Sequence, residues 1–276
     1  AQSRAFSETA DFRPIATPQP GDWLAEHHER GQSFERFQRS SPNQPDNARQ
    51  TIYVQPLGAT EGAPLDALTR FTADYFQLPV KTLPTLSLEA LRVTERDNDG
   101  VRQLLAPELL TRLAERLPDD AYCLIGVTMT DLYPDPEWNF VFGYASLSER
   151  VGVHSLARYD PAFYGRDVSA PVRDALVLER GAKVMAHELG HMFGMQHCVY
   201  YDCVMNGSNH LDESDDKPMH LCPLCLRKLQ ASVGFDPGAR YQRLGARYEA
   251  LGLSRDAEWA RRRAAFVTTG DASAAP

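Results

Sequence analysis

A chain of 276 residues with 43% hydrophobic and 24% charged residues is long enough for one large globular domain or two small ones. The formal net charge of −8 argues against a nucleic-acid partner, because binding to a phosphate backbone relies on clustered Lys and Arg. No apolar run approaches the roughly 20 residues of a membrane-spanning helix, and the N-terminus lacks the basic and apolar stretches of a secretion signal. We therefore expect a cytoplasmic protein with no membrane partner; the composition gives no indication of oligomeric state.

The chain divides into three predicted parts. Residues 1–50 are polar, contain scattered prolines and lack a sustained period, so we predict an irregular N-terminal arm. Residues 51–235 alternate between strand and helix patterns, as the main domain of the chain would. Residues 236–276 are predicted to add a helical C-terminal extension.

The pattern between residues 51 and 128 is that of an α/β layer. β-Branched and aromatic residues favour strands, whereas apolar residues at spacings of three and four favour helices. The predicted elements are a strand at 51–57, a helix from residue 65 that ends before Leu78-Pro79, a short strand at 80–83, a helix from Pro107 to Leu117, and a buried central strand at 122–128.

The second half of the chain adds extended segments and longer helices. Residues 139–145 and 151–158 are predicted to be extended, and the second segment is expected at a sheet edge. The remaining predictions are a helix at 171–195, a loop at 198–225, a helix at 226–233, and two tail helices, one with Tyr241, Leu244, Tyr248 and Leu251 on a stripe and one capped by Ser254.

A metal-binding motif of the form HExxHxxGxxH lies near the end of the long predicted helix. Residues four apart share one face of a helix, so His187 and His191 can bind one ion while Glu188 points at an open coordination position. Gly194 can adopt the left-handed conformation that ends the helix and reverses the chain. This reversal would make His197 the third ligand.

Three protein ligands leave one zinc position open for water, as in catalytic sites. Zinc lowers the pKa of such a water to about 7, so Glu188 can act as general base in the hydrolysis of a peptide bond. The alternative is a non-catalytic, zinc-stabilised module that binds a peptide or protein without cutting it. Cobalt, copper and nickel also bind three histidines, so zinc is inferred from geometry and availability.

Four of the five cysteines predict a second metal site. Cys198, Cys203, Cys222 and Cys225 have the spacing Cys-x4-Cys-x18-Cys-x2-Cys. Four thiolates complete the tetrahedral coordination of zinc and leave no place for water, so this zinc would be structural. Free thiols and two disulfides are the alternatives. Cys123 lies in an apolar run and is predicted to be a buried, inert thiol.

The combined motifs resemble one family, the archaemetzincins. The family pattern HExxHxxGxxHCx4CxMxGSN followed by CPxC reads without departure from His187 to Cys225 and includes Met205. Segments upstream, 52–58 and 138–143 among them, look like those of the longer, vertebrate-type archaemetzincins. The resemblance covers about residues 51–235.

The resemblance implies a metzincin-like zincin fold of the α/β (α+β) class, with a mixed, mostly parallel twisted sheet and an active-site helix. It implies a catalytic domain at 51–235 with two zinc ions, one catalytic and one structural, and a methionine turn in which Met205 packs beneath the histidine ligands. A lone Met is otherwise plain core packing. The substrate would be a peptide or protein lying along an edge strand, expected at 151–158. Internal cleavage and cleavage from an N-terminus both stay open.

Three other features receive no catalytic role. His210 is predicted to be solvated or to cap a helix. His154 has an even chance of facing a substrate or facing elsewhere, because strand residues alternate between faces. The acidic run is predicted to be a solvated loop; it consists of Asp212, Glu213, Asp215 and Asp216.

Overall fold

The computed structural model describes residues 2–7 and 10–270, which fall into two compact units. The first, here called the sheet unit, is Asn43–Ala73 with Leu78–Phe193. The second, here called the helical unit, is Ala1–Pro42 with Asp74–Gln77 and Gly194–Pro276. The three-part division of the sequence stays a prediction.

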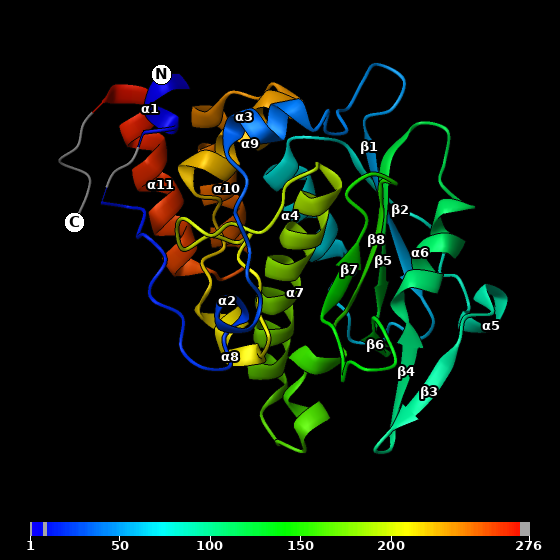
Figure 1. Cartoon of the computed structure of the whole chain (residues 1–276). Coiled ribbons are helices and arrows are strands. Elements are labelled where there is room, and N and C mark those ends of the chain that lie inside the picture. Colours follow the sequence, from blue (N-terminus) through cyan, green and yellow to red (C-terminus); the bar gives the residue numbers. More distant parts are fainter. Residues whose placement is uncertain (1, 8–9, 271–276) are drawn as a thin grey trace. The chain divides into compact units, whose positions relative to one another are not determined.

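The sheet unit is built on a five-stranded, mostly parallel sheet (Figure 1). Its strand order is β2-β1-β5-β8-β7, with β7 antiparallel to β8 and the other neighbours parallel. This confirms the predicted mixed α/β sheet. The strands are β1 (Thr51–Leu57), β2 (Val80–Thr82), β5 (Ala121–Thr128), β7 (Gly143–Ala145) and β8 (Val151–Ser155).

A second, three-stranded sheet in this unit is absent from the sequence-based prediction. Strands β3 (Glu95–Asn98) and β4 (Val101–Leu105) form an antiparallel hairpin, and β6 (Asp131–Tyr133) pairs with β4 in parallel. Strand β3 is polar throughout, and β4 carries Val101, Leu104 and Leu105 without strict alternation, so the pair lacks the apolar alternation of a half-buried strand. The Asp99-Gly100 turn, with φ of 54° and 84°, is the signal that could have revealed the hairpin.

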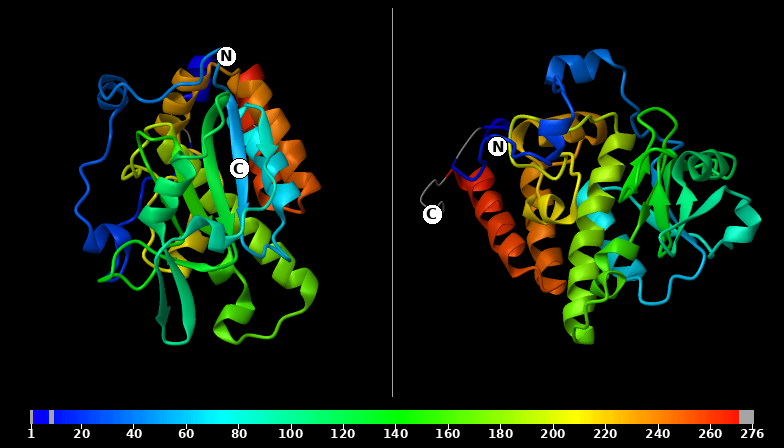
Figure 2. Two further views of the ribbon diagram at one scale, coloured as in Figure 1. Left: turned by 90° about the vertical axis from the view of Figure 1, so that its right-hand side faces the viewer. Right: turned by 60° about the horizontal axis from the view of Figure 1, so that its bottom comes forward.

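Helices cover both faces of the five-stranded sheet. Residues along β8 alternate, so Val153 points to the face covered by α6 (Ala106–Ala114), where it joins Leu113 in one apolar cluster. Gly152 points to the other face, where Met192 of α7 (Ala170–Met192) approaches it. The long helix α7, which carries the histidine motif, is therefore packed directly on the sheet (Figure 2).

The structure corrects two predictions for the region after β6. The segment 151–158 is not a sheet edge, because β8 lies between β5 and β7 and all five of its residues are buried. Its valines and glycine fit an interior strand, whereas His154 and Ser155 made it look half exposed. The segment 139–145 is strand only in its last three residues, and the edge position belongs to β7.

The helical unit contains the N-terminal arm, the cysteine-rich loop and three longer helices. The two tail helices contact each other extensively, and α1 (Gln2–Ala5) packs on both of them. Asp11 in the arm pairs with the fully buried Arg263 at 2.9 Å, which holds the arm against the last helix. The longer helices are α9 (Pro223–Val233), α10 (Pro237–Ala250) and α11 (Ser254–Thr269).

Short helices complete the described chain. The arm was predicted to be irregular, but three of these helices lie within it. Helices this short do not form alone, so they depend on tertiary packing, such as that of the buried Phe37 side chain in the third of them. None of the described helices has the length and apolar character needed to cross a membrane. The remaining helices are α1 (Gln2–Ala5), α2 (Trp23–Glu26), α3 (Phe34–Arg39), α4 (Leu65–Phe76), α5 (Leu88–Leu91), α8 (Leu211–Asp216) and the 3-10 turns Ala157–Tyr159 and Pro161–Tyr164.

Candidate metal centres and active site

Two histidines converge at the end of α7 in the sheet unit. His187 and His191 lie four residues apart, and their Nε2 atoms are 3.0 Å from each other. Zinc–nitrogen bonds of about 2.0–2.1 Å place two tetrahedral ligands about 3.3 Å apart. The pair therefore fits two ligands of one metal ion. His197 lies beyond the helix and belongs to the helical unit, so its role as third ligand stays a prediction.

Glu188 lies between the two histidines in sequence and against the edge strand in space. It is only 6% exposed. A Cβ atom at Gly143, the first residue of β7, would lie 2.5 Å from Glu188 Oε1. Only glycine lets the edge strand come this close to the carboxylate. Gly143 was not predicted to have a role, although glycine in a strand often marks a close approach of backbone.

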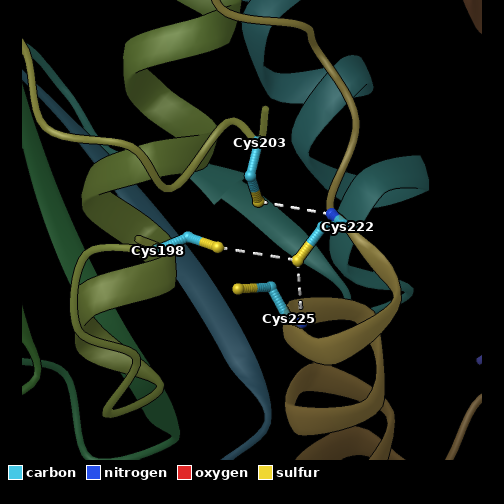
Figure 3. A group of neighbouring side chains, drawn as sticks. All are labelled: Cys198, Cys203, Cys222 and Cys225. Atoms are coloured by element: carbon cyan, nitrogen blue, oxygen red, sulfur yellow. Dashed lines mark hydrogen bonds between the residues drawn. The ribbon is translucent and has the colours of Figure 1, made fainter. Parts of the chain in front are cut away.

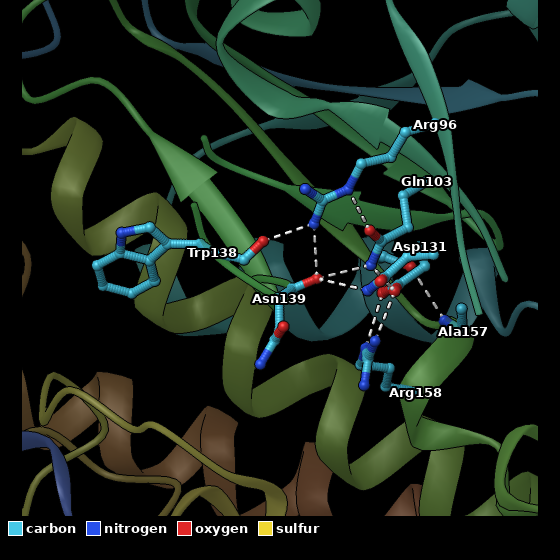
Figure 4. Close-up of polar contacts among 9 residues, drawn as sticks. Arg96, Gln103, Asp131, Trp138, Asn139, Ala157 and Arg158 are labelled. Carbon is cyan, nitrogen blue, oxygen red and sulfur yellow. Dashed lines mark hydrogen bonds and ion pairs between the residues drawn. The ribbon is translucent and has the colours of Figure 1, made fainter. Parts of the chain in front are cut away.

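A buried ion pair supports the loop that leads into β7 (Figure 4). Asp131 accepts hydrogen bonds from Arg158 Nε at 2.9 Å and Nη2 at 2.7 Å, a bidentate arrangement. Gln103 Nε2 donates to the same carboxylate at 2.6 Å. The Arg158 guanidinium also stacks on Phe140, 3.6 Å from the ring centroid. These contacts fix one side of the loop.

Backbone carbonyls of the same loop are bound by side chains of the small sheet (Figure 4). Gln103 Nε2 donates to Asn139 O at 2.9 Å. Arg96 donates to Pro136 O at 3.1 Å, Trp138 O at 2.5 Å and Asn139 O at 3.0 Å. Residues 136–139 are therefore ordered by side-chain hydrogen bonds in place of a strand ladder. Sequence patterns cannot reveal this, because the partners are distant in the chain.

The end of α7 is fixed by an aromatic residue of the central strand. Tyr122 Oη donates to Met192 O at 3.0 Å, and its ring stacks on Phe193 with centroids 4.4 Å apart. Gly194 follows with φ of 77°, the left-handed conformation expected for the residue that ends this helix. The predicted left-handed conformation of Gly194 is confirmed.

His197 has a carboxylate partner from the N-terminal arm. Its Nδ1 lies 2.8 Å from Glu29 Oε1. The ring also meets the Trp23 indole edge to face, with centroids 5.0 Å apart. Both partners come from residues 1–50, a segment to which the sequence analysis gave no functional residue.

The four cysteines form a buried cluster in the helical unit (Figure 3). Their sulfur atoms all lie within 4.8 Å of one another, and the Sγ atoms of Cys198 and Cys222 are 3.7 Å apart. Zn–S bonds of about 2.3 Å place tetrahedral sulfur atoms about 3.8 Å apart. The cysteines are not joined by disulfides. The donor set therefore fits zinc, and the disulfide alternative is wrong.

Backbone groups of α9 orient the sulfur atoms. Cys222 is the N-cap of this helix, and its Sγ accepts the N–H of Cys225 at 3.5 Å. Cys203 Sγ accepts the N–H of Cys222 at 3.3 Å. Hydrogen bonds from Cys203, then Cys222 and Cys225, lower the pKa of the Cys198 thiol. Burial instead raises the pKa of Cys123, in agreement with its predicted inertness.

The turn that contains Met205 is tied to the cysteine loop. Met205 is fully buried, and its carbonyl accepts the N–H of Cys198 at 2.8 Å. The Asn206 side chain accepts the N–H of Cys203 at 2.7 Å and donates to Cys198 O at 2.7 Å. Asn206 thus joins both ends of the first cysteine pair. This role of Asn206 was not predicted, because Asn is common in turns for local reasons.

The structure explains three features that were left without a catalytic role. His210 is the N-cap of α8, where Nδ1 accepts the N–H of Glu213 at 3.2 Å, so the capping prediction is confirmed. The acidic run forms this helix and not a loop, with Asp212 in the first turn, where negative charge is favourable. His154 is fully buried, and burial lowers its pKa to about 3.

Comparison with known proteins gives a consistent result. Residues 90–231 match the model of peptidase family M54. Archaemetzincin-2 of Macaca fascicularis is 38% identical over 88% of this chain and 76% of its own length. The archaemetzincin of Archaeoglobus fulgidus, crystallised with malonate, is 31% identical with a TM-score of 0.51, over 64% of this chain and 99% of its own. A zinc-dependent peptidase from Methanocorpusculum labreanum is 25% identical with a TM-score of 0.52, over the same shares. The family model spans more than half of the chain and the macaque relative aligns with most of it, so the chain belongs to the archaemetzincins, the zinc metallopeptidases of peptidase family M54.

Proposed function

We propose that the chain hydrolyses peptide bonds at a zinc ion held by His187, His191 and His197, with Glu188 as general base. The observation that carries this proposal is the convergence of the two Nε2 atoms, 3.0 Å apart, on the helix that also presents the buried Glu188. His197 is added on chain connectivity, because it follows the left-handed Gly194 by only three residues, a reach of about 10 Å.

The protein residues would divide the chemistry among them. Zinc in such a site supplies Lewis acidity and makes water acidic enough to lose a proton near neutral pH. Glu188 would take the proton from the attacking water and pass it to the leaving amine. Its position against Gly143 keeps the carboxylate beside the edge strand, where a peptide bound to that strand would present its backbone.

The substrate is proposed to lie extended along β7, the edge strand of the sheet. Edge strands pair readily with peptide backbone, which gives affinity with little dependence on sequence. Two exposed aromatic residues lie in β7 or in the loop that leads into it, Tyr144 at 38% and Trp138 at 41%. They offer apolar contact to substrate side chains, and the family supports a peptide or protein substrate.

A second zinc ion is proposed for the cysteine cluster. Four sulfur ligands leave no open coordination position, so this ion would not take part in hydrolysis. It would stabilise the loop of Met205 and the start of α9, whose Cys222 and Cys225 supply two of the ligands. The proposed stoichiometry is therefore two zinc ions per chain.

Metal analysis and peptide-library cleavage on the wild type and Glu188→Gln test the proposal. The glutamine has nearly the shape of the native side chain but cannot accept the proton. We expect two zinc ions in both proteins and cleavage by the wild type alone. Undiminished cleavage by Glu188→Gln would refute the general-base role, and two zinc ions without cleavage by either protein would support the peptide-binding alternative.

A further inference from the structure

A carboxylate from the N-terminal arm contacts the third histidine of the motif. We propose that Glu29 is a positioning residue for His197: its carboxylate accepts a hydrogen bond from the Nδ1–H of the imidazole and so leaves Nε2 as the metal-binding atom. The proposal rests on the proposed role of His197 as a zinc ligand. It starts from the 2.8 Å contact between Glu29 Oε1 and His197 Nδ1.

The chemistry of the two groups decides which nitrogen carries the proton. An ionised carboxylate can only accept hydrogen bonds, so a close contact with Nδ1 places the hydrogen on Nδ1. The neutral imidazole then has its free lone pair on Nε2. Histidines that bind metals commonly have such a partner, which fixes the tautomer, orients the ring and raises the basicity of the ligating nitrogen.

Glu29 is itself held in place. Trp23 Nε1 donates to the same Oε1 atom at 3.0 Å. The Trp23 ring contacts His197 edge to face and lies over His27 with centroids 4.0 Å apart. The Trp23 indole and the His197 imidazole both contact Oε1 of Glu29. These two contacts together fix the position of the carboxylate relative to the imidazole.

The arm is anchored to the turn that follows Met205. The N–H of Trp23 donates to Glu213 Oε1 at 2.9 Å, and Glu213 Oε2 accepts the N–H of Asn209 at 2.7 Å. The indole also lies directly on Gly207, where a Cβ atom would come within 2.4 Å of Trp23 Cδ1. Glycine at 207 therefore makes room for the arm, which is built into the surroundings of His197.

This assignment gives the arm a function that the motif alone does not indicate. Glu29 and Trp23 lie outside residues 90–231, the stretch that matches the family model. An inhibitory segment would block the metal-binding nitrogen of His197. The Glu29 carboxylate instead contacts Nδ1 of His197 and leaves Nε2 to a metal. The arm would support metal binding instead of competing with it.

Zinc affinity of the full chain tests the proposal directly. Glu29→Ala is expected to weaken zinc binding at the histidine site about 10- to 100-fold in competition with a chelator, the range for losing such a partner. The zinc of the cysteine cluster serves as an internal reference and should keep its affinity. Trp23→Phe keeps a ring on Gly207 but removes one donor to Glu29, so a loss of only about threefold is expected.

Glu26→Ala is the matched control. This carboxylate lies in the same arm, but its contact is with the backbone N–H of Gly21 at 3.3 Å. We expect wild-type zinc affinity from this variant. If Glu29→Ala also binds zinc within threefold of the wild type, the proposal is wrong.

A spectroscopic measurement distinguishes a positioning effect of Glu29 on His197 from unfolding of the N-terminal arm. In the zinc-loaded wild type, ¹⁵N-labelled histidine spectra should show His197 protonated at Nδ1, and Glu29→Gln should shift this signal while the melting temperature stays close to that of the wild type. A His197 signal protonated at Nε2 would overturn the proposal. Weaker zinc binding by Glu29→Ala in a protein that cuts no peptide would leave this inference standing while the proposed peptidase function fails.

Discussion

The cysteine cluster and the histidine motif, the two proposed metal sites, are built in different ways. The four cysteines lie in one unit, are buried together, and have backbone N–H groups directed at two of their sulfur atoms. His187 and His191 are presented by a single helix, and the third histidine of the motif takes its carboxylate partner, Glu29, from a distant part of the chain. A closed site needs little beyond its ligands, whereas an open site for chemistry depends on residues that orient them.

The largest expected effect follows from removal of one ligand from the four-cysteine cluster. Cys225→Ser removes one sulfur ligand from the buried cluster, and structural zinc contributes on the order of 10 kcal/mol to the folding of small zinc domains. We expect loss of one zinc ion per chain and unfolding of at least the helical unit, measured by metal analysis and circular dichroism. Cys123→Ala, which deletes an equally buried sulfur outside the cluster, should keep both zinc ions.

The second largest effect is expected from loss of the Asp131–Arg158 ion pair, which supports the loop into the edge strand β7. Asp131→Asn leaves Arg158 without its carboxylate, and breaking a buried ion pair costs about 3 kcal/mol. We expect the free energy of unfolding in urea to fall by about this amount and KM to rise, because the loop into β7 loses an anchor. Asp120→Asn breaks the exposed pair with Lys81 and should have a much smaller effect. Equal effects of the two variants would show that the buried pair has no special importance.

Gly143→Ala tests the approach of the edge strand to Glu188, the proposed general base. The added methyl group would overlap Glu188, so the carboxylate must shift. Displacement of a catalytic group by about 1 Å can slow a reaction about 100-fold. We therefore expect peptide cleavage to slow by about 10- to 100-fold at saturating substrate, with both zinc ions retained.

The control for this variant is Gly181→Ala on the same helix. Its methyl group would press on Leu156, 2.8 Å away, and it lies seven residues before Glu188. Gly181→Ala should therefore lower stability without a comparable loss of turnover rate. A turnover rate that falls equally in both variants would mean that general overpacking, not the position of Glu188, limits the reaction.

The smallest expected effect is a pH dependence of stability from His154. Burial lowers its pKa to about 3, so the folded protein keeps it neutral while the unfolded chain binds a proton below pH 6.5. The stability that this neutral group preserves near pH 7 is lost progressively as pH falls from 6.5 toward 3. The loss is about 1 kcal/mol at pH 6.

Urea unfolding at pH 7.5 and pH 6 compares the wild type with His154→Leu. Zinc binding weakens in acid in both proteins, so the difference between them reports on His154. The variant should lose less stability than the wild type over this interval. Identical losses would mean that His154 does not titrate as its burial predicts.

The sequence predicts features whose physical cause is local. The spacing of His187 and His191, the left-handed Gly194 and the cysteine pairs follow from helix geometry and metal chemistry, and the structure agrees with each. Glu29 was not predicted, because its partner His197 lies 168 residues away and nothing near Glu29 marks it. The edge strand was misplaced for a similar reason, since β8 becomes interior only when β7 pairs beside it.

Stepwise removal of zinc tests the contrast between the two sites most directly. A chelator of moderate strength is added to the zinc-loaded wild type while peptide cleavage and circular dichroism are followed together. We predict that the first zinc ion leaves with loss of cleavage and with the fold intact, and that loss of the second ion unfolds the helical unit. Cleavage that survives removal of both ions, or unfolding that accompanies loss of the first, would contradict the division into a catalytic and a structural site.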